Sequence, residues 1–413
     1  MAISRGSIHH SLIDDLNNLL VSIFGKPFNL SAASPEEKRN LSTKIEDYYC
    51  GQNATLFPFA RTAFYAILKS LSLPPGSTIL LTPFNIYPML DIIHALGYKP
   101  LFVDIDLQDF GPVEDDLIFH LQQKPACFLM TYLFGSVPNV SRIAELCHQY
   151  SVPLIEDISQ NIGSKHKGKY LGTFGIASIY SASLTKYVDA YNGAFALTAN
   201  DSIASSLQQF ALSKLVPTSK PRLRLVIAKT FFWNLLLNLS VFSVLTLPLL
   251  KLLKFFSPTK FESLLGPSIR KTSTLDLPRY YFEDIAHIQC QQLGLSLSRL
   301  NHLIKLRRSA AKKASLAFFG YVDETKNQQS TFWQFICPVK NVSEARALLF
   351  QHGIETGTTN LPDLSSGFFD ISLPNSKRLK STQLFIPLHK QLRESDYLKI
   401  AMLLRSKNLL INT

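Results

Sequence analysis

Short apolar segments alternate with helical segments over the first half of the chain, and this alternation limits the fold more than any other feature. After Phe59, the segments STILLTP, KPLFVDID, ACFLMTYL and VPLIED have apolar centres, which is typical of strands buried on both faces. Between them lie segments with helical periodicity, including RTAFYAILKSL, YPMLDIIHALG and VSRIAELCHQY. The pattern predicts an α/β fold, in which helices cover both faces of a mainly parallel sheet in three layers.

The rest of the chain predicts three further parts. Residues 1–50 indicate an N-terminal helical lead-in, because SLIDDLNNLLVSIF is amphipathic and Ser34-Pro35-Glu36-Glu37 is a good helix start. Residues 285–413 indicate a smaller C-terminal α+β domain that opens with a long helix. We therefore expect a large domain over residues 51–284, interrupted by an apolar helical insert at about 214–271.

The insert is apolar in its centre and basic on its flanks. Thr230–Leu250 holds 21 residues without a charge, and apolar residues occupy every face of the helix it would form. Such a helix is buried in protein or placed in lipid. Much of the formal net charge of +12 lies in this part of the chain, which carries ten basic residues and the single acid Glu262. The basic residues are Lys214, Lys220, Arg222, Arg224, Lys229, Lys251, Lys254, Lys260, Arg270 and Lys271.

Basic residues around an apolar, tryptophan-containing segment favour an anionic membrane surface over nucleic acid, so we expect no nucleic-acid partner. A core helix with solvated flanks is the alternative.

The five cysteines form no C-x-x-C pair, which excludes a disulfide framework and the usual zinc spacings, and we expect no metal. The N-terminus has no apolar signal region, so a cytoplasmic location is expected.

Polar residues at the expected carboxyl ends of the strands are the candidate site, because open α/β sheets bind ligands there. Ala60-Arg61-Thr62-Ala63 opens a helix whose amides would face an anion such as phosphate, with a plain helix cap as the alternative. Asp157, just past a buried strand, would hold a protonated heteroaromatic nitrogen, act as a base, or cap a turn. Ser181 and Lys186 leave another strand, and a partly buried lysine can form a Schiff base. Asn192-Gly193 permits a tight turn before the next strand.

These motifs, in this order, resemble the DegT-type sugar aminotransferases, which are pyridoxal phosphate enzymes of fold type I. TAFYAIL stands where the family has S-G-T-A-A-L, and GYKPLFVDID matches G-x-K-P-x-F-V-D-V-D. EDISQ matches E-D-x-x-Q, and the IYSASLTK segment matches F-S-F-F-P-T-K. The resemblance covers residues 55–200, and HGIETGTT and QLFIPLHKQLRESDYLKIAMLL agree more loosely with the family's small domain.

The resemblance implies pyridoxal 5'-phosphate as the cofactor and a catalytic role for two residues. Lys186 would form the Schiff base and then shuttle the α-proton. Asp157 would keep the pyridine nitrogen protonated, so that the ring withdraws electrons. Gln160 would bond a substituent of the ring.

The remaining matches imply contacts to the cofactor's phosphate and ring face. Ser181, Thr62 and the backbone at Ala63 would hold the phosphate. Tyr87, in the TPFNIYP loop, would stack on the ring, with Phe84 as the alternative because this loop is one residue shorter than the family's pattern.

Departures from the family concern the substrate more than the cofactor. Arg61 replaces a small residue, the glycine run after the lysine is reduced to Asn192-Gly193, and Ile162 replaces a histidine. The family's R-N-H-G turn is missing around Ser213-Lys214, where the insert begins. The lysine is present, whereas the dehydratase branch of the family carries a histidine there, so the resemblance favours transamination.

We therefore expect a homodimeric aminotransferase that moves an amino group, from glutamate, onto a nucleotide-linked keto-sugar. The alternatives are a pyridoxal phosphate-dependent sugar dehydratase or epimerase, and a non-catalytic member docked on a membrane. Lys186 and the small domain must share one side of any membrane, and residues 225–256 are too short for two crossings of about 20 residues each. We expect this segment to lie in the interface of the cytoplasmic leaflet, or else in the dimer interface.

Overall fold

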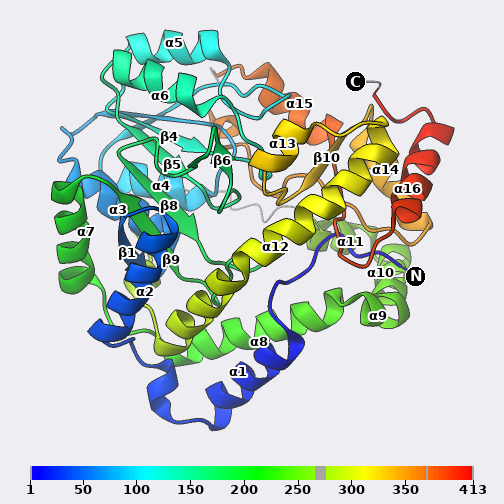
Figure 1. Cartoon of the computed structure of the whole chain (residues 1–413), viewed down its shortest axis with the longest axis horizontal. Coiled ribbons are helices and arrows are strands. Elements are labelled where there is room, and N and C mark those ends of the chain that lie inside the picture. Colours follow the sequence, from blue (N-terminus) through cyan, green and yellow to red (C-terminus); the bar gives the residue numbers. More distant parts are fainter. Residues whose placement is uncertain (1, 266–275, 369–370, 412–413) are drawn as a thin grey trace.

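A seven-stranded sheet forms the centre of the larger domain in the computed structural model, which describes residues 2–265, 276–368 and 371–411 (Figure 1). In spatial order its strands are β1 (Asn53–Phe57), β9 (Ala194–Thr198), β8 (Ala177–Ser181), β5 (Leu154–Asp157), β4 (Cys127–Thr131), β2 (Thr78–Leu81) and β3 (Lys99–Phe102). The five strands from β8 to β3 are parallel, and β9 and β1 pair antiparallel. The mainly parallel sheet is confirmed. Strand β9 returns antiparallel because a loop without a crossover helix joins it to β8.

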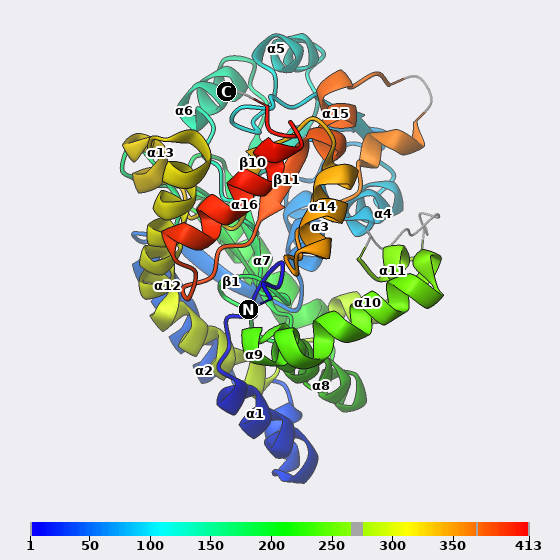
Figure 2. The same cartoon turned by 90° about the vertical axis from the view of Figure 1, so that its right-hand side faces the viewer.

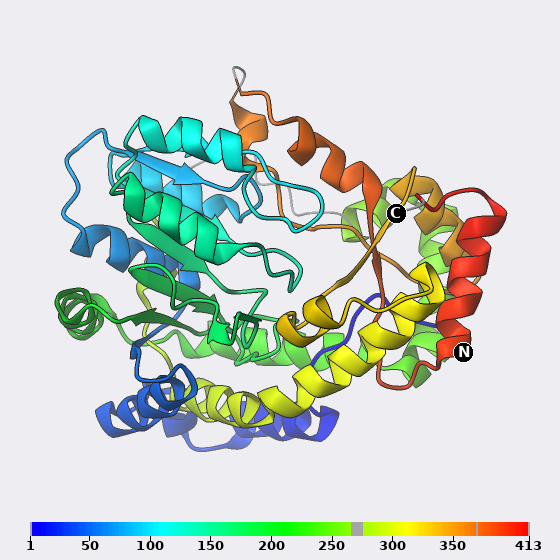
Figure 3. The ribbon, with the colours of Figure 1, turned by 45° about the horizontal axis from the view of Figure 1, so that its top comes forward.

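Helices cover both faces of this sheet (Figure 3). The first face packs against α3 (Ala60–Ser70), α4 (Tyr87–Ala95) and α7 (Asp201–Lys214). The second packs against α2 (Pro35–Tyr48), α5 (Glu114–Gln122), α6 (Val140–Gln149) and α12 (His287–Phe319). Successive side chains of β4 point to opposite faces of the sheet. Cys127 and Leu129 pack on the face covered by α3, and Phe128 and Met130 pack on the face covered by α12.

The long helix α12 joins the two domains and runs diagonally across the molecule (Figure 1). Leu293 and Leu300 in its first half pack into the core of the large domain, and Ala311 and Ala314 in its second half pack into the small domain. The expected boundary at residue 285 therefore marks the start of a helix that both domains share.

The small domain is built around an antiparallel pair, β10 (Phe335–Pro338) and β11 (Gln383–Ile386). Its helices are α13 (Glu324–Gln329), α14 (Val342–Gln351), α15 (Pro374–Thr382) and α16 (Glu394–Ser406), with a 3-10 turn, η4 (Leu364–Gly367). The other short elements are η1 (Pro27–Leu30), η3 (Arg279–Phe282) and the hairpin of β6 (Lys165–His166) and β7 (Lys169–Tyr170).

The N-terminal lead-in touches both domains and the insert. Helix α1 (Leu12–Phe24) lies alongside α8 (Lys220–Leu237), the first helix of the insert (Figure 1). Ahead of α1 the chain forms a short parallel bridge between Ile3 and Ile354 of the small domain. The Ile3 N–H donates to the Gly353 carbonyl at 2.9 Å, and the Glu355 N–H donates to the Ile3 carbonyl at 2.8 Å. These contacts fix the first residues at the boundary between the domains.

The insert does not form one helix through Thr230–Leu250, and this corrects the sequence-based expectation. Helix α8 ends at Leu237, and the side chain of Asn238 accepts a hydrogen bond from the Ser240 N–H at 3.1 Å, which caps a new helix. This helix runs from α9 (Leu239–Val241) through a π-helical turn, η2 (Phe242–Thr246), into α10 (Leu247–Phe256), followed by α11 (Pro258–Leu265). Pro248 has no N–H to donate, which accounts for the widened turn before it. Residues 266–271 of the expected insert lie outside the described residues.

Within this chain the second helix of the insert is only partly buried. Among the described residues, Leu239–Phe256 is the one helix long and apolar enough to cross a membrane, and 17% of it is buried. Its buried residues Phe242 and Leu247 pack against Phe350 of α14. Its outer side chains Val244 and Phe255 are 81% and 79% exposed. The helix therefore packs one side against the small domain, and its other side is apolar and exposed. Figure 2 shows α9 and α10 beneath the small domain.

Candidate active site

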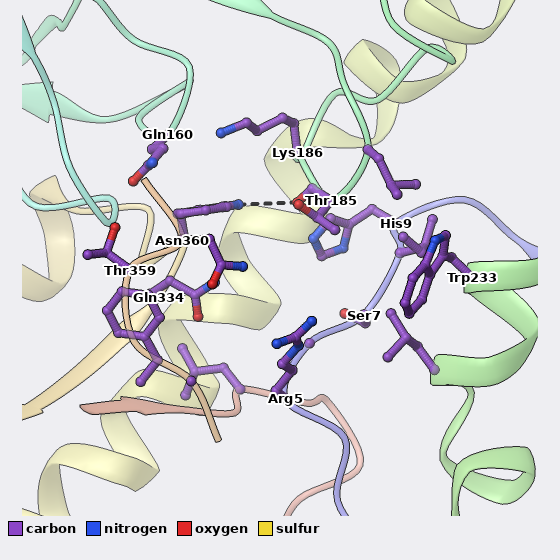
Figure 4. A pocket seen from close by; sticks show the side chains of 18 of the residues that line it. Arg5, Ser7, His9, Gln160, Thr185, Lys186, Trp233, Gln334, Thr359 and Asn360 are labelled. Carbon is purple, nitrogen blue, oxygen red and sulfur yellow. Dashed lines mark hydrogen bonds between the residues drawn. The ribbon is translucent and has the colours of Figure 1, made fainter. Parts of the chain in front are cut away.

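A cavity of about 480 Å³ lies between the domains, and Lys186 lines it (Figure 4). The N-terminal segment, the loops after β5 and β8, helix α8 and loops of the small domain form its walls. None of its described lining residues is an aspartate or a glutamate. Four are basic: Arg5, Lys186, Lys229 and Arg307. The cavity is therefore suited to an anionic ligand.

Lys186 follows β8 and extends into the cavity beside Trp333. Its Nζ lies 4.4 Å from the centroid of the Trp333 ring, and the Trp333 indole N–H donates to the Thr185 carbonyl at 3.1 Å, which holds the ring in place (Figure 4). Burial lowers the pKa of Lys186 to about 8, although the nearby Asp157 carboxylate acts in the opposite direction. Such an amine is partly neutral, and hence nucleophilic, at mildly alkaline pH.

Asp157 ends β5 and is 4% exposed. Its Oδ1 accepts from the Ser159 N–H at 3.0 Å, and its Oδ2 accepts from Asn85 Nδ2 at 3.3 Å. Burial raises the pKa of this carboxyl, while Ser159, Lys186 and Asn85 lower it. The structure thus places Asp157 near enough to Lys186 for each group to shift the pKa of the other, at the carboxyl edge of the sheet where the sequence predicts both. Asp157 does not itself line the cavity.

The neighbouring acid, Glu156, has a structural role. It is fully buried, and its Oε1 accepts from the Tyr132 hydroxyl at 2.7 Å and from the Gly172 N–H at 2.8 Å. Its Oε2 accepts from the N–H groups of Phe174 and Gly175, both at 2.7 Å. Because each oxygen of Glu156 already accepts two hydrogen bonds, this carboxylate fixes the turn beside β5. Of the two adjacent acids, Asp157 is therefore the candidate for binding the cofactor.

Gln160 and Ser181 lie at the same edge of the sheet. Gln160 lines the cavity, and its Oε1 accepts from the Phe134 N–H at 2.7 Å. The Ser181 hydroxyl donates to Ser183 Oγ at 3.1 Å, and its backbone N–H donates to Ser159 Oγ at 3.1 Å. Ser181 is thus linked through Ser159 to Asp157, although it does not itself line the cavity.

The start of α3 differs from the expectation. The Thr62 hydroxyl is buried and donates to the carbonyl of Tyr281 in η3. The backbone N–H groups of Thr62 and Ala63 both donate to the Phe59 carbonyl, at 3.0 and 3.1 Å. Neither residue lines the cavity that holds Lys186. The chain that returns from the insert covers this helix end, so the assignment of a phosphate to Thr62 and Ala63 finds no support in the contacts.

The expected stacking residues also lie elsewhere. Tyr87 begins α4 and packs, half-buried, against the apolar cluster on the α3 face of the sheet. Phe84 is fully buried in a separate cluster with Phe110 and Phe134. Neither ring lines the cavity, whereas both tryptophans of the chain, Trp233 and Trp333, do.

The cavity residues that sequence reasoning missed include Arg5, His9, Trp233 and Trp333. They come from the N-terminus, the insert and the small domain, and no local spacing connects them with Lys186. The sequence offers no local signal that would have placed them in one cavity.

A buried polar network attaches the N-terminal segment to the insert and to the loop after Lys186. His10 Nδ1 lies 2.7 Å from Asp15 Oδ1, and His10 Nε2 lies 2.7 Å from the Asp189 carbonyl. Both neighbours are acceptors, so both ring nitrogens carry protons. Asn234 of α8 and the Tyr191 hydroxyl donate to the Asp15 carboxylate, each at 2.7 Å. Burial lowers the pKa of His10, but Asp15 and Asp189 outweigh it and raise the pKa to about 9.

We expect the stability of the protein to fall as the pH rises through about 9. A histidine whose pKa is raised on folding stabilises the protein fully below its unfolded value of about 6.5, and this contribution, up to about 3 kcal/mol, is lost as the pH approaches the folded value. The check is the midpoint of thermal unfolding from pH 6 to 10. It should fall in the wild type more steeply than in His10→Gln, and parallel curves would show that His10 is not charged in the folded state.

The sheet, the second domain and a lysine at the carboxyl edge are those of a pyridoxal phosphate-dependent enzyme of fold type I. A putative sugar aminotransferase from Streptococcus pneumoniae, solved in its PLP form, superposes with a TM-score of 0.68 at 15% identity, over 98% of each chain. At this identity the likeness shows the fold. Residues 32–223 match the model of the DegT/DnrJ/EryC1/StrS aminotransferase family. The resemblance found in the sequence is therefore confirmed, and pyridoxal phosphate is the cofactor of this family.

Curated relatives match over the same part of the chain. A pleiotropic regulatory protein of Geobacillus stearothermophilus is 30% identical over 143 residues, which are 34% of this chain and 38% of that protein. The GDP-perosamine synthase of Escherichia coli O157:H7 is 27% identical over 165 residues, which are 39% of this chain and 45% of that protein. The chain thus spans about two-fifths of the length of these relatives.

Proposed function

We propose that this chain is a pyridoxal phosphate-dependent aminotransferase that moves an amino group from glutamate onto a nucleotide-linked keto-sugar. The observation that carries the proposal is that the Lys186 amine lines a basic cavity between the two domains, with the buried Asp157 carboxylate near enough to raise the pKa of that amine against the effect of burial. The relative named GDP-perosamine synthase supports a nucleotide-linked sugar as the acceptor. We propose that the enzyme acts as a homodimer, which light scattering tests.

The residues fit the cofactor at its reactive end. The cofactor, when bound, supplies an aldehyde and a ring that withdraws electrons from the carbon next to the amino group. Lys186 provides a partly neutral amine for the aldehyde, and the same amine is the base that accepts the α-proton and returns it. Asp157 would hold the proton on the ring nitrogen, with its carboxylate oriented by Asn85 and Ser159.

Addition of L-glutamate to the pyridoxal phosphate-loaded protein tests this function. The absorbance band of the bound cofactor near the visible edge should disappear in a single turnover, and a nucleotide-linked keto-sugar should restore it. D-glutamate is the matched control and should leave the band unchanged. A protein that shows the band but does not respond to L-glutamate or another L-amino acid is not an aminotransferase.

We further propose that α9–α10 docks the enzyme on the cytoplasmic face of an anionic membrane. Val244, Phe255 and Phe256 are 81%, 79% and 77% exposed, and they form an outward apolar face. Lys251 and Lys254 lie on the same helix, and Leu239–Phe256 contains no acid. An amphipathic helix with this charge binds anionic lipid headgroups while its apolar face enters the interface. Co-sedimentation with phosphatidylglycerol vesicles, and its loss with phosphatidylcholine vesicles, would support the proposal.

A further inference from the structure

The N-terminal segment supplies a fixed cation to the cavity. Figure 4 shows the Arg5 guanidinium pointing into the cavity from the wall below Lys186. Arg5 Nε lies 3.5 Å from Glu355 Oε1, and the Arg5 backbone N–H donates to Glu355 Oε2 at 3.3 Å. The bridge between Ile3 and Ile354 fixes the adjoining backbone. An arginine oriented in this way presents a planar set of donors that matches phosphate oxygens.

Helix α8 supplies a second cation and an aromatic ring to the same cavity. Lys229, Trp233 and Leu237 are spaced four residues apart, and all three line the cavity, so one face of α8 is directed into it. The face is held in register by Ile227, which is fully buried, and by the bond from Asn234 to Asp15. Lys229 is exposed and makes no ion pair with any residue that the structure describes.

The other two cations of the cavity have different tasks. Arg307 donates to the carbonyls of Phe332, Trp333 and Leu388 at 2.5–3.2 Å, so it holds the wall of the small domain together. Lys186 is the amine that the proposed function requires. Arg5 and Lys229 are therefore the two positive charges that face a ligand without a part in the chemistry.

We infer that Arg5, Lys229 and Trp233 form a diphosphate-binding subsite, and the insert contributes two of these three residues. The inference rests on the proposed function, because it assigns the residues that hold the diphosphate of the acceptor. The diphosphate has two sources with the same chemistry. A nucleotide diphosphate would also stack its base on Trp233. A lipid diphosphate would extend toward the exposed apolar face of α9–α10, which continues from the end of α8.

Binding of inorganic pyrophosphate to the pyridoxal phosphate-loaded protein tests the subsite. Tryptophan fluorescence is a direct readout because both tryptophans line the cavity. Pyrophosphate should change the fluorescence, and Lys229→Gln should weaken its Kd by about tenfold or more. Arg5→Lys, which keeps the charge but loses the planar donors, should weaken it less. Lys251→Gln removes a charge from the same insert outside the cavity, and it should bind pyrophosphate as the wild type does. Unchanged affinity in Lys229→Gln overturns the inference.

Competition then identifies the source. Displacement of pyrophosphate by uridine diphosphate assigns the subsite to a nucleotide, and displacement by farnesyl diphosphate but not by uridine diphosphate assigns it to a lipid. Displacement by neither overturns the inference. The response of the cofactor band to L-glutamate involves no diphosphate, so in the wild type it tests the aminotransferase function separately from the subsite. Failure of that response in the wild type would count against the aminotransferase function. A wild type that responds to L-glutamate but does not bind pyrophosphate would overturn the subsite and leave the aminotransferase function standing.

Discussion

Lys186→Ala is expected to abolish covalent capture of pyridoxal phosphate and to reduce aminotransferase activity by on the order of 10⁴-fold or more. The variant loses both the amine that reaches the aldehyde and the base that moves the α-proton, and proton transfer alone contributes up to about 10⁴-fold. The measurement is the absorbance of the protein after excess cofactor has been removed by gel filtration. The band should be absent in Lys186→Ala.

The fold should tolerate this change. Burial lowers the pKa of Lys186 to about 8, so the charged amine is disfavoured in the folded state near neutral pH and its removal relieves that cost. The midpoint of thermal unfolding of the apoprotein should therefore not decrease. Lys99→Ala is the matched control, because Lys99 is an exposed lysine at the opposite end of a strand in the same sheet. A band retained in Lys186→Ala would assign the chemistry to another amine.

Combined replacement of Val244, Phe255 and Phe256 by glutamate should weaken binding to anionic vesicles by at least about 100-fold. Each wild-type side chain is mostly exposed, and burying such a side chain contributes roughly 1.5–3 kcal/mol. The substitutions also add three negative charges to a face that carries Lys251. Because none of the three side chains belongs to the packed face with Phe242 and Leu247, the fold should be retained.

The control for this experiment introduces a single glutamate at an exposed apolar position outside α9–α10. Leu212 of α7 is 84% exposed on the large domain, and Leu212→Glu should leave vesicle binding unchanged. Equal binding by the triple variant and the wild type would exclude α9–α10 as the membrane contact. A wild-type protein that ignores vesicles, together with a triple variant that becomes monomeric, would assign the face to the dimer interface instead.

Local patterns determined much of the fold and part of the site. The apolar centres of β2, β4 and β5, and the helical periodicity between them, predict the layered sheet because a strand buried on both faces has few other solutions. Lys186 and Asp157 both follow such strands, and carboxyl ends of neighbouring parallel strands meet at one edge. Their proximity thus follows from local sequence and one topological rule.

Short-range sequence patterns did not predict the role of a side chain where several hydrogen-bond partners are within its reach in the fold. Glu156 and Asp157 are adjacent acids, and only the donors of the turn beside β5 show that Glu156 is structural. Thr62 lies at the start of a helix as expected, yet its hydroxyl donates to the carbonyl of Tyr281, which follows the insert in the sequence. The uncharged segment read as one helix is divided by the cap at Asn238.

The sequence by itself determined the layered α/β domain, the resemblance to the aminotransferase family and the placement of Lys186 and Asp157 at one edge of the sheet, since these depend on periodicity and on motifs within single strands and loops. Only the tertiary structure decided what encloses the lysine: Arg5 from the first residues, Trp233 from the insert and Trp333 from the small domain. The physical reason is that these residues are brought together by the shared helix α12 and by the pairing of Ile3 with Ile354. Contacts between segments so far apart leave no trace in the spacing of residues along the chain.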